Sequence, residues 1–342
     1  MIFGTLFVYF LIVKPILAAA PPPPAAAAPA VAPAPAAAPA PAAEEFTIDE
    51  YKFVWRLVKS DDAHLDLMKT QDAICVGLGS KNDLVIEKSL LLTPGEAEAI
   101  GAVLARTDEF WNTMRGSAHA ASHDVPVDPY VVTFSRNPKY GFSVAVRDTT
   151  AIVAESILLT REQAKTIAPH MRKAQKMAAF MNRKIEPSRP VAAPAPAAEE
   201  FAIDEYYFFW RVFKSKGAHL DVVKMRDATI IWLYHINLGV INISTAMDPK
   251  DAEAIGAILA RTDEFWSTMK GSAQVVRRDV PTDRYVITFL YSPTCGLNVV
   301  ISKVKEIMSE EILVDRDEAK ALARHMQKAR KMAEFLDRKI RP

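Results

Sequence analysis

Residues 107–111 read Thr-Asp-Glu-Phe-Trp, and residues 262–266 read the same five residues again. This match belongs to a longer repeat, because residues 44–187 align without a gap with residues 199–342 at a constant offset of 155. Each copy is much longer than the units of about 20–50 residues that build solenoids, and it has the size of an ordinary domain. The sequence therefore predicts two homologous tandem domains with paired sites.

The segments outside the two copies have compositions unlike that of a folded core. Residues 21–43 and 188–198 are rich in Pro and Ala and almost uncharged, which predicts extended linkers. Residues 1–20 begin with a short apolar run, which fits a targeting segment such as a secretory signal, a membrane anchor or a misassigned start. We expect membrane contact only if this segment is retained.

Charge and cysteine content narrow the function classes. The net charge is only +1, so bulk charge does not indicate a strongly basic nucleic-acid binder. Cys75 and Cys295 occupy different positions in the two copies, so they predict neither a disulfide framework nor a metal cluster. The sequence has no Gly-rich phosphate loop, nucleophile elbow or metal-spaced set of His and Cys. We therefore expect a non-enzymatic protein with no catalytic residues, cofactor or metal.

Period-two alternation and helix caps predict the same order of elements in each copy. Thr93 with Pro94 and Glu96 forms a capping box, which predicts a helix that ends near Gly116. Thr160 begins a second capping box and a final helix. In the first copy the predicted strands are 51–58, 64–69, 73–76, 84–86, 130–134, 142–146, 151–153 and 156–159. Each copy reads ββββα-ββββα, an α+β class with antiparallel sheets and packed helices.

Two stretches carry a resemblance to a known family. Leu92-Thr93-Pro94-Gly95-Glu96-Ala97, leading to Asp108-Glu109-Phe110-Trp111, is similar to the cap, helix and aromatic helix end of the Whirly fold. The spacing of the later strands and final helix, over residues 130–180, is similar as well. Whirly-fold proteins include plant organellar single-stranded-DNA-binding proteins and kinetoplastid mitochondrial RNA-binding proteins. The Lys-Gly-Lys-type segment of the plant proteins has no match here, so the binding residues of the family are not transferred.

The tandem arrangement resembles kinetoplastid mitochondrial single-stranded DNA- or RNA-binding proteins. The resemblance implies a single-stranded DNA- or RNA-binding protein in mitochondrial nucleic-acid maintenance or RNA metabolism. A second hypothesis is a structural or assembly subunit of a mitochondrial ribonucleoprotein complex, which the near-neutral charge favours. A third, a secreted or membrane-tethered protein, depends on residues 1–20 alone. The resemblance also implies a pseudo-fourfold assembly, and we expect the domains to pack through helices with small residues, such as Ala97, Gly101 and Ala174.

The binding candidates are aromatic and basic residues on the first two strands of each copy. Binding of a single strand needs rings on which bases stack and positive charges that follow the backbone. Trp55 and Trp210 are stacking candidates, with the alternative that they face the core. The basic candidates for phosphate contact are Lys52, Arg56, Lys59, Lys69, Arg211, Lys214 and Lys224.

Two other features are interpreted as structural. Phe110-Trp111 and Phe265-Trp266 end a helical stripe, which favours core anchors over ligand contacts. His119 and His123 are close in sequence, but Gln274 and Arg278 replace them in the second copy, so a loop without metal is predicted.

Overall fold

The computed structural model describes residues 46–60, 62–81, 87–150, 156–185, 201–237, 241–304 and 311–340. The predicted N-terminal segment, both predicted linkers and the predicted strands at 84–86 and 151–153 lie outside these residues. We call the described residues 46–185 the first half and 201–340 the second half.

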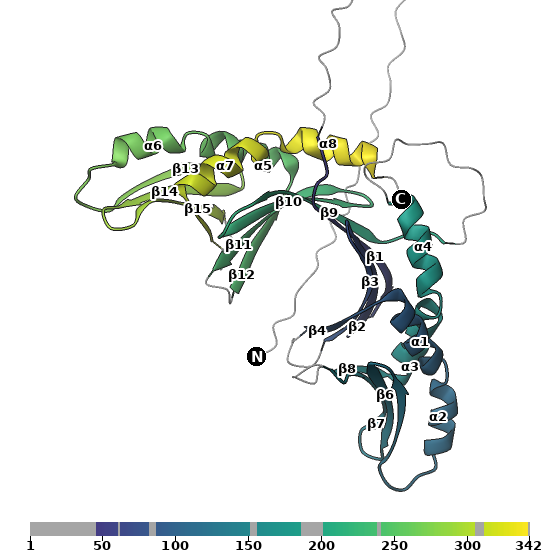
Figure 1. Cartoon of the computed structure of the whole chain (residues 1–342). Coiled ribbons are helices and arrows are strands. Elements are labelled where there is room, and N and C mark those ends of the chain that lie inside the picture. Colours follow the sequence, from purple (N-terminus) through teal and green to yellow (C-terminus); the bar gives the residue numbers. More distant parts are fainter. Residues whose placement is uncertain are drawn as a thin grey trace, which may run out of the picture. The chain divides into compact units, whose positions relative to one another are not determined.

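The first half follows the predicted order, with each helix divided in two (Figure 1). Its elements are β1 (Tyr51–Lys59), β2 (Ala63–Thr70), β3 (Ile74–Lys81), β4 (Glu87–Leu92), α1 (Pro94–Leu104), α2 (Thr107–Met114), β5 (Ala121–Val127), β6 (Tyr130–Asn137), β7 (Gly141–Asp148), β8 (Ser156–Thr160), α3 (Arg161–Met171) and α4 (Ala174–Lys184).

The second half repeats this order, so the α+β class with antiparallel sheets is confirmed. Its elements are β9 (Tyr206–Lys214), β10 (Ala218–Met225), β11 (Thr229–Asn237), β12 (Ile241–Met247), α5 (Pro249–Leu259), α6 (Thr262–Met269), β13 (Val276–Pro281), β14 (Tyr285–Ser292), β15 (Gly296–Lys303), β16 (Ile312–Asp315), α7 (Arg316–Met326) and α8 (Ala329–Lys339).

One strand of the first half contradicts the sequence interpretation. The segment around His119 and His123 was predicted as a loop, but residues 121–127 form β5, an edge strand paired with β6. Edge strands tolerate the polar residues and the proline that this segment contains. The ring of His123 lies 4.8 Å from that of Phe110, so it packs against α2.

The helix starts agree with the predicted caps. Thr93 accepts a hydrogen bond from the Glu96 N–H, and the Glu96 carboxylate accepts one from the Thr93 N–H. Thr160 and Gln163 repeat this capping box at α3. These reciprocal bonds satisfy N–H groups that a helix leaves without an internal partner, and they fix where each helix begins.

The predicted long helices are each divided in two in the structure. After α1, the buried Thr107 hydroxyl donates to the Leu104 carbonyl at 2.6 Å, and the matching bond from Thr262 is 2.5 Å. The second division follows Met171 and Met326. Pro169 precedes only the first of these, since Arg324 occupies the equivalent position. The divisions therefore depend on local hydrogen bonding and packing and not on proline.

A close helix crossing lies at this second division. A Cβ atom on Gly101 would lie 2.8 Å from the Arg172 nitrogen, and one on Gly256 would lie 2.7 Å from the Gln327 nitrogen. The glycines thus let the backbone of α1 approach the backbone at the end of α3, and the backbone of α5 approach the end of α7. Gly101 was expected to pack one domain against the other, but it packs two helices of the same half against each other.

The two halves join through strands, contrary to the expected helix packing. β1 pairs antiparallel with β9, which makes one sheet of order β12-β11-β10-β9-β1-β2-β3-β4. Phe53 pairs with Phe208, which is its equivalent at the offset of 155. The Arg56 N–H donates to the Glu205 carbonyl at 2.9 Å, and the equivalent bond from Arg211 to Glu50 is 3.0 Å. The register is therefore pseudo-twofold about the Phe53–Phe208 pair, a junction that we call the seam.

The helices cover one face of this sheet in each half (Figure 1). Trp55 lies on that face, 4% exposed, with Phe180 of α4 and Phe201 as neighbours at 5.9 and 6.2 Å. Trp210 is equally buried between Phe335 of α8 and Phe46. Each tryptophan is thus covered by a helix of its own half and a phenylalanine from the segment before the other half's first strand.

Candidate functional site: an aromatic and basic sheet face

The other face of the eight-stranded sheet is the candidate site. Side chains alternate between the two faces of a strand, so the burial of Phe53, Trp55 and Trp210 under helices places their neighbours on the opposite face. We call this opposite face, on the side of Lys52 and Tyr207, the open face. No described helix packs on it in Figure 1.

Four aromatic side chains form a row across the second half of the open face. Ring centroids are 6.3 Å apart between Tyr207 and Phe209, 6.2 Å between Phe209 and Trp232, and 5.2 Å between Trp232 and Tyr234. The His219 ring stacks on Tyr234 at 4.3 Å and ends the row. All five side chains are partly exposed. We call these five residues the aromatic row.

The row is supported from below by β10. Phe209 on β9 and Trp232 on β11 meet above Val223, which is fully buried, and beside Asp221, which is 3% exposed. Burial raises the pKa of the Tyr234 hydroxyl, and the Asp221 carboxylate raises it further. Burial lowers the pKa of His219, as does the Arg211 guanidinium, and both favour the neutral imidazole. The row therefore presents uncharged rings.

Two arginines on this face are held by buried carboxylates. Arg56 donates to both oxygens of Asp66 at 2.8 and 2.9 Å, and its guanidinium lies 5.8 Å from the Tyr207 ring centroid. Arg211 donates to Asp221 at 2.9 and 3.3 Å and to Glu50 at 3.0 Å. The hydrogen bonds to Asp66 and Asp221 are the main cause of the raised pKa of each arginine. Each guanidinium is therefore compensated by a carboxylate of the protein, and the two arginines add no net positive charge to the open face.

Three predicted lysines do reach solvent on the open face. Lys52 is exposed and pairs across the seam with Phe209. Lys59 and Lys214 are exposed and pair with His64 and His219, which lie on the same face. Directly opposed residues of antiparallel strands project to the same side. Lys52 therefore lies beside the row at Phe209 and Lys214 beside it at His219, whereas Lys59 lies on the first half of the same face.

The other four predicted residues lie on the helix-covered face. Trp55 and Trp210 are core residues, so the core alternative holds and no ring surface is left for a base. Lys69 is 8% exposed, opposite Phe53. Lys224 forms an ion pair of 2.9 Å with Asp337 of α8, which holds it against the helix. None of these four side chains has the exposure that phosphate or base contact requires.

The aromatic row was missed although the sequence carries its signal. Residues 206–210 read Tyr-Tyr-Phe-Phe-Trp, and five successive aromatic residues in a strand must place rings on both faces. The repeat draws attention to positions that both copies share, such as Trp55 and Trp210. The row residues differ between the copies, with Lys52 and Val54 at the positions of Tyr207 and Phe209.

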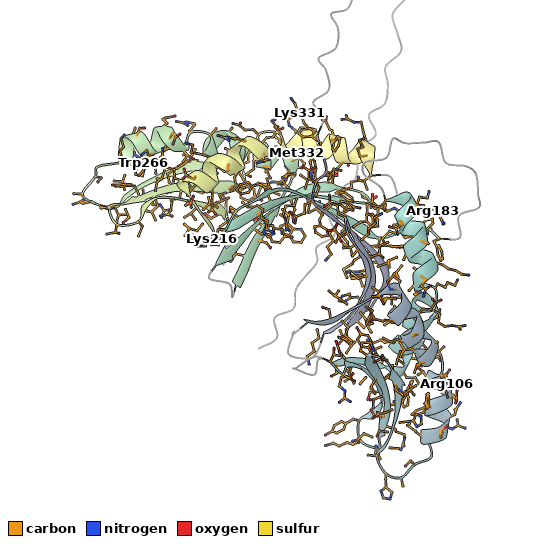
Figure 2. All side chains as sticks on the ribbon, in the orientation of Figure 1. Arg106, Arg183, Lys216, Trp266, Lys331 and Met332 are labelled. Carbon is orange, nitrogen blue, oxygen red and sulfur yellow. The ribbon has the colours of Figure 1, made fainter. Side chains whose placement is uncertain are left out.

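Basic helix faces form a second charged surface. Figure 2 shows Arg183 on α4 and Lys331 on α8, where Lys331 is exposed and the adjacent Met332 is buried. Trp111 and Trp266, expected as core anchors, are only partly buried, and each lies about 5 Å from the guanidinium of Arg161 or Arg316 on a neighbouring helix. These helix surfaces carry scattered cations but no row of exposed rings.

Other kinds of site are absent from the described part of the chain. Its His, Cys, Asp and Glu residues include no group of three that could hold a metal ion. None of its helices has the length and apolar character needed to cross a bilayer. No protein-family model and no curated protein matches the sequence.

Proposed function

We propose that the protein binds single-stranded DNA or RNA on the open face and is not an enzyme. The observation that carries this proposal is the aromatic row with Lys52 and Lys214 beside it and Lys59 on the first half of the same face. Stacking on aromatic rings is worth about 1–3 kcal/mol per base and needs no particular sequence. A helix-free sheet with rings and lysines is a surface on which single strands stack. The expected setting, which rests on the family resemblance, is mitochondrial nucleic-acid maintenance or RNA metabolism.

The charge arrangement predicts how such binding depends on salt. Since Arg56 and Arg211 are satisfied by carboxylates, the three exposed lysines are the described cations of the open face that are available to phosphates. Three phosphate contacts give a slope of log K against log salt of about −2 for a single strand. The binding should therefore be dominated by stacking and only moderately weakened by salt.

The experiment is a fluorescence anisotropy titration of labelled single-stranded DNA, single-stranded RNA and the matching duplex over a range of salt. We expect both single strands, or one of them, to bind with the shallow slope, and the duplex to bind much less because its bases cannot reach the rings. Equal binding of the duplex, or no binding of any probe at low salt, would contradict the proposal.

A second candidate function is a structural subunit of a ribonucleoprotein that uses the open face for protein contact. The observation in its favour is the internal neutralisation of both arginines, because protein interfaces combine partly buried aromatic residues with compensated charge. The same titration separates the two candidates, since a protein-contact surface leaves the oligonucleotide unbound at every salt concentration.

A further inference from the structure

The two halves of the open face share their strand arrangement and their Arg–Asp pairs but differ in the other side chains that they present. The pairs Arg56–Asp66 and Arg211–Asp221 occupy equivalent positions on the two sides of the seam. The side chains beside these pairs are not equivalent. Where the second half has Tyr207, Phe209, Trp232 and Tyr234, the first half has Lys52, Val54, Gly77 and Gly79.

The first half lacks room for stacking rings as well as the rings themselves. A Cβ atom on Gly79 would lie 2.1 Å from Cε1 of His64, so this imidazole occupies the place of a side chain there. A Cβ atom on Gly77 would lie 2.8 Å from the terminal methyl of Met68. His64 and Met68 thus cover the two glycines, and the surface of β3 offers no aromatic ring to a base.

The seam brings the cations of one half to the rings of the other. Lys52 of β1 is the cross-strand partner of Phe209, and Val54 is the partner of Tyr207. Directly opposed residues have Cβ atoms about 5 Å apart. Arg56 of the first half also lies over the Tyr207 ring. Through Lys52, the first half therefore supplies positive charge beside an aromatic row that belongs to the second half.

We propose that each chain holds one single-stranded segment across the seam, with bases on the aromatic row and a phosphate on Lys52, and not one segment per half. This inference rests on the proposed function and adds its stoichiometry and its division of roles. It replaces the paired sites that the sequence repeat predicts. One composite site requires both halves, because neither half alone has the rings together with Lys52.

The test uses the full chain and a thymidine oligonucleotide of about eight nucleotides, within the range of known site sizes. Isothermal titration calorimetry should give one oligonucleotide per chain. The double variant Trp232→Gly/Tyr234→Gly, which copies the first half, should bind at least about tenfold more weakly with an unchanged salt slope. The variant Trp232→Phe/Tyr234→Phe, which keeps both rings, should bind within a few-fold of the parent and shows that loss of binding reflects the lost rings.

The contribution of Lys52 is tested with one variant and one matched control variant. Lys52→Gln should reduce the steepness of the salt slope by about 0.7, as expected for one lost phosphate contact on a single strand. Lys139→Gln removes an exposed lysine from a hairpin of the first half outside this sheet, and it should leave the slope unchanged.

The possible results separate this inference from the function on which it rests. Two oligonucleotides per chain, or full affinity after loss of both rings in a folded variant, overturns the single composite site while the proposed function stands. An unchanged slope in Lys52→Gln overturns the role of Lys52. No binding by the parent chain at low salt overturns the proposed function itself, and with it this inference.

Discussion

Phe53 pairs with Phe208, its own equivalent in the repeat, and their ring centroids lie 6.4 Å apart at the centre of the eight-stranded sheet. Both side chains are fully buried. Each also stacks on a tyrosine of the other half, Phe53 on Tyr206 at 5.5 Å and Phe208 on Tyr51 at 5.4 Å. This symmetric cluster makes the two halves share one core at the seam.

Truncation of either phenylalanine side chain at the seam should therefore lower the free energy of unfolding by the same amount. We expect Phe53→Ala and Phe208→Ala each to lower the free energy of unfolding by about 3–5 kcal/mol, because each leaves a cavity in the shared cluster. Chemical denaturation followed by circular dichroism measures both. Tyr140→Ala, at a side chain that is 77% exposed, is the control and should be nearly neutral. A large difference between the two phenylalanine variants would argue against a shared core.

The close crossing of α1 and α3 predicts that the stability of the protein depends on the glycine at position 101. Gly101→Ala should destabilise the protein by about 1–3 kcal/mol, since the added methyl group would overlap the Arg172 backbone and Met171. Gly116→Ala is the matched control, because nothing lies within 4 Å of a Cβ atom there. Thermal unfolding of both variants checks this prediction. A Gly101→Ala protein as stable as the parent would show that α1 and α3 can separate at no cost.

The Arg56–Asp66 pair is expected to stabilise the fold, and this effect must be distinguished from any effect on nucleic-acid binding. Asp66→Ala should lower the free energy of unfolding by about 1–3 kcal/mol, because it leaves a half-buried guanidinium without its acceptor. Glu109→Ala breaks the exposed pair with Arg106, which solvent screens, and should destabilise the protein much less than Asp66→Ala does. Urea unfolding compares the two variants, and equal costs would contradict the structural role of Asp66. Changes at Arg56 are for this reason poor tests of phosphate contact.

Two partly buried histidines, His170 and His325, predict a loss of stability in mild acid. The pKa of His170 and of His325 is lowered, first by burial and then by nearby cations, Lys173 for His170, and Lys328 and Arg324 for His325. The unfolded chain binds these protons near the ordinary pKa of about 6.5. This contribution to stability is therefore complete above about pH 6.5 and is lost as the pH falls towards the folded pKa values.

The melting temperature should accordingly fall between about pH 7 and pH 5.5. The double variant His170→Asn/His325→Asn should show a smaller fall, and the exposed His119→Asn variant should behave as the parent. A fall of the same size in the double variant would assign the acid sensitivity to other groups.

The features predicted from the sequence are those that interactions between near neighbours in the chain determine. The caps at Thr93 and Thr160 were predicted because their hydrogen bonds lie within four residues. The close crossing at the second division was not predicted, because it brings Gly101 against Arg172, a partner 71 residues away. β5 was missed because an edge strand carries little apolar alternation.

The candidate site was predicted in part for a related reason. Alternation from Trp55 gave the outward direction of Lys52 and Arg56, which the structure bears out. No sequence pattern showed that Asp66 would neutralise Arg56, or that β9 would pair with β1 and bring Phe209 beside Lys52. These relations arise from strand order, which the repeat alone does not determine.

The most direct test of the central claim is ultraviolet crosslinking of the full chain to a uridine- or thymidine-containing single strand, followed by mass spectrometry of the crosslinked peptides. We expect adducts on the peptides of β9 and β11 that carry Tyr207, Phe209 and Trp232, and their loss when an unlabelled competitor strand is added. Adducts confined to the basic helices α4 and α8, around Arg183 and Lys331, would contradict the claim that the open face binds the strand.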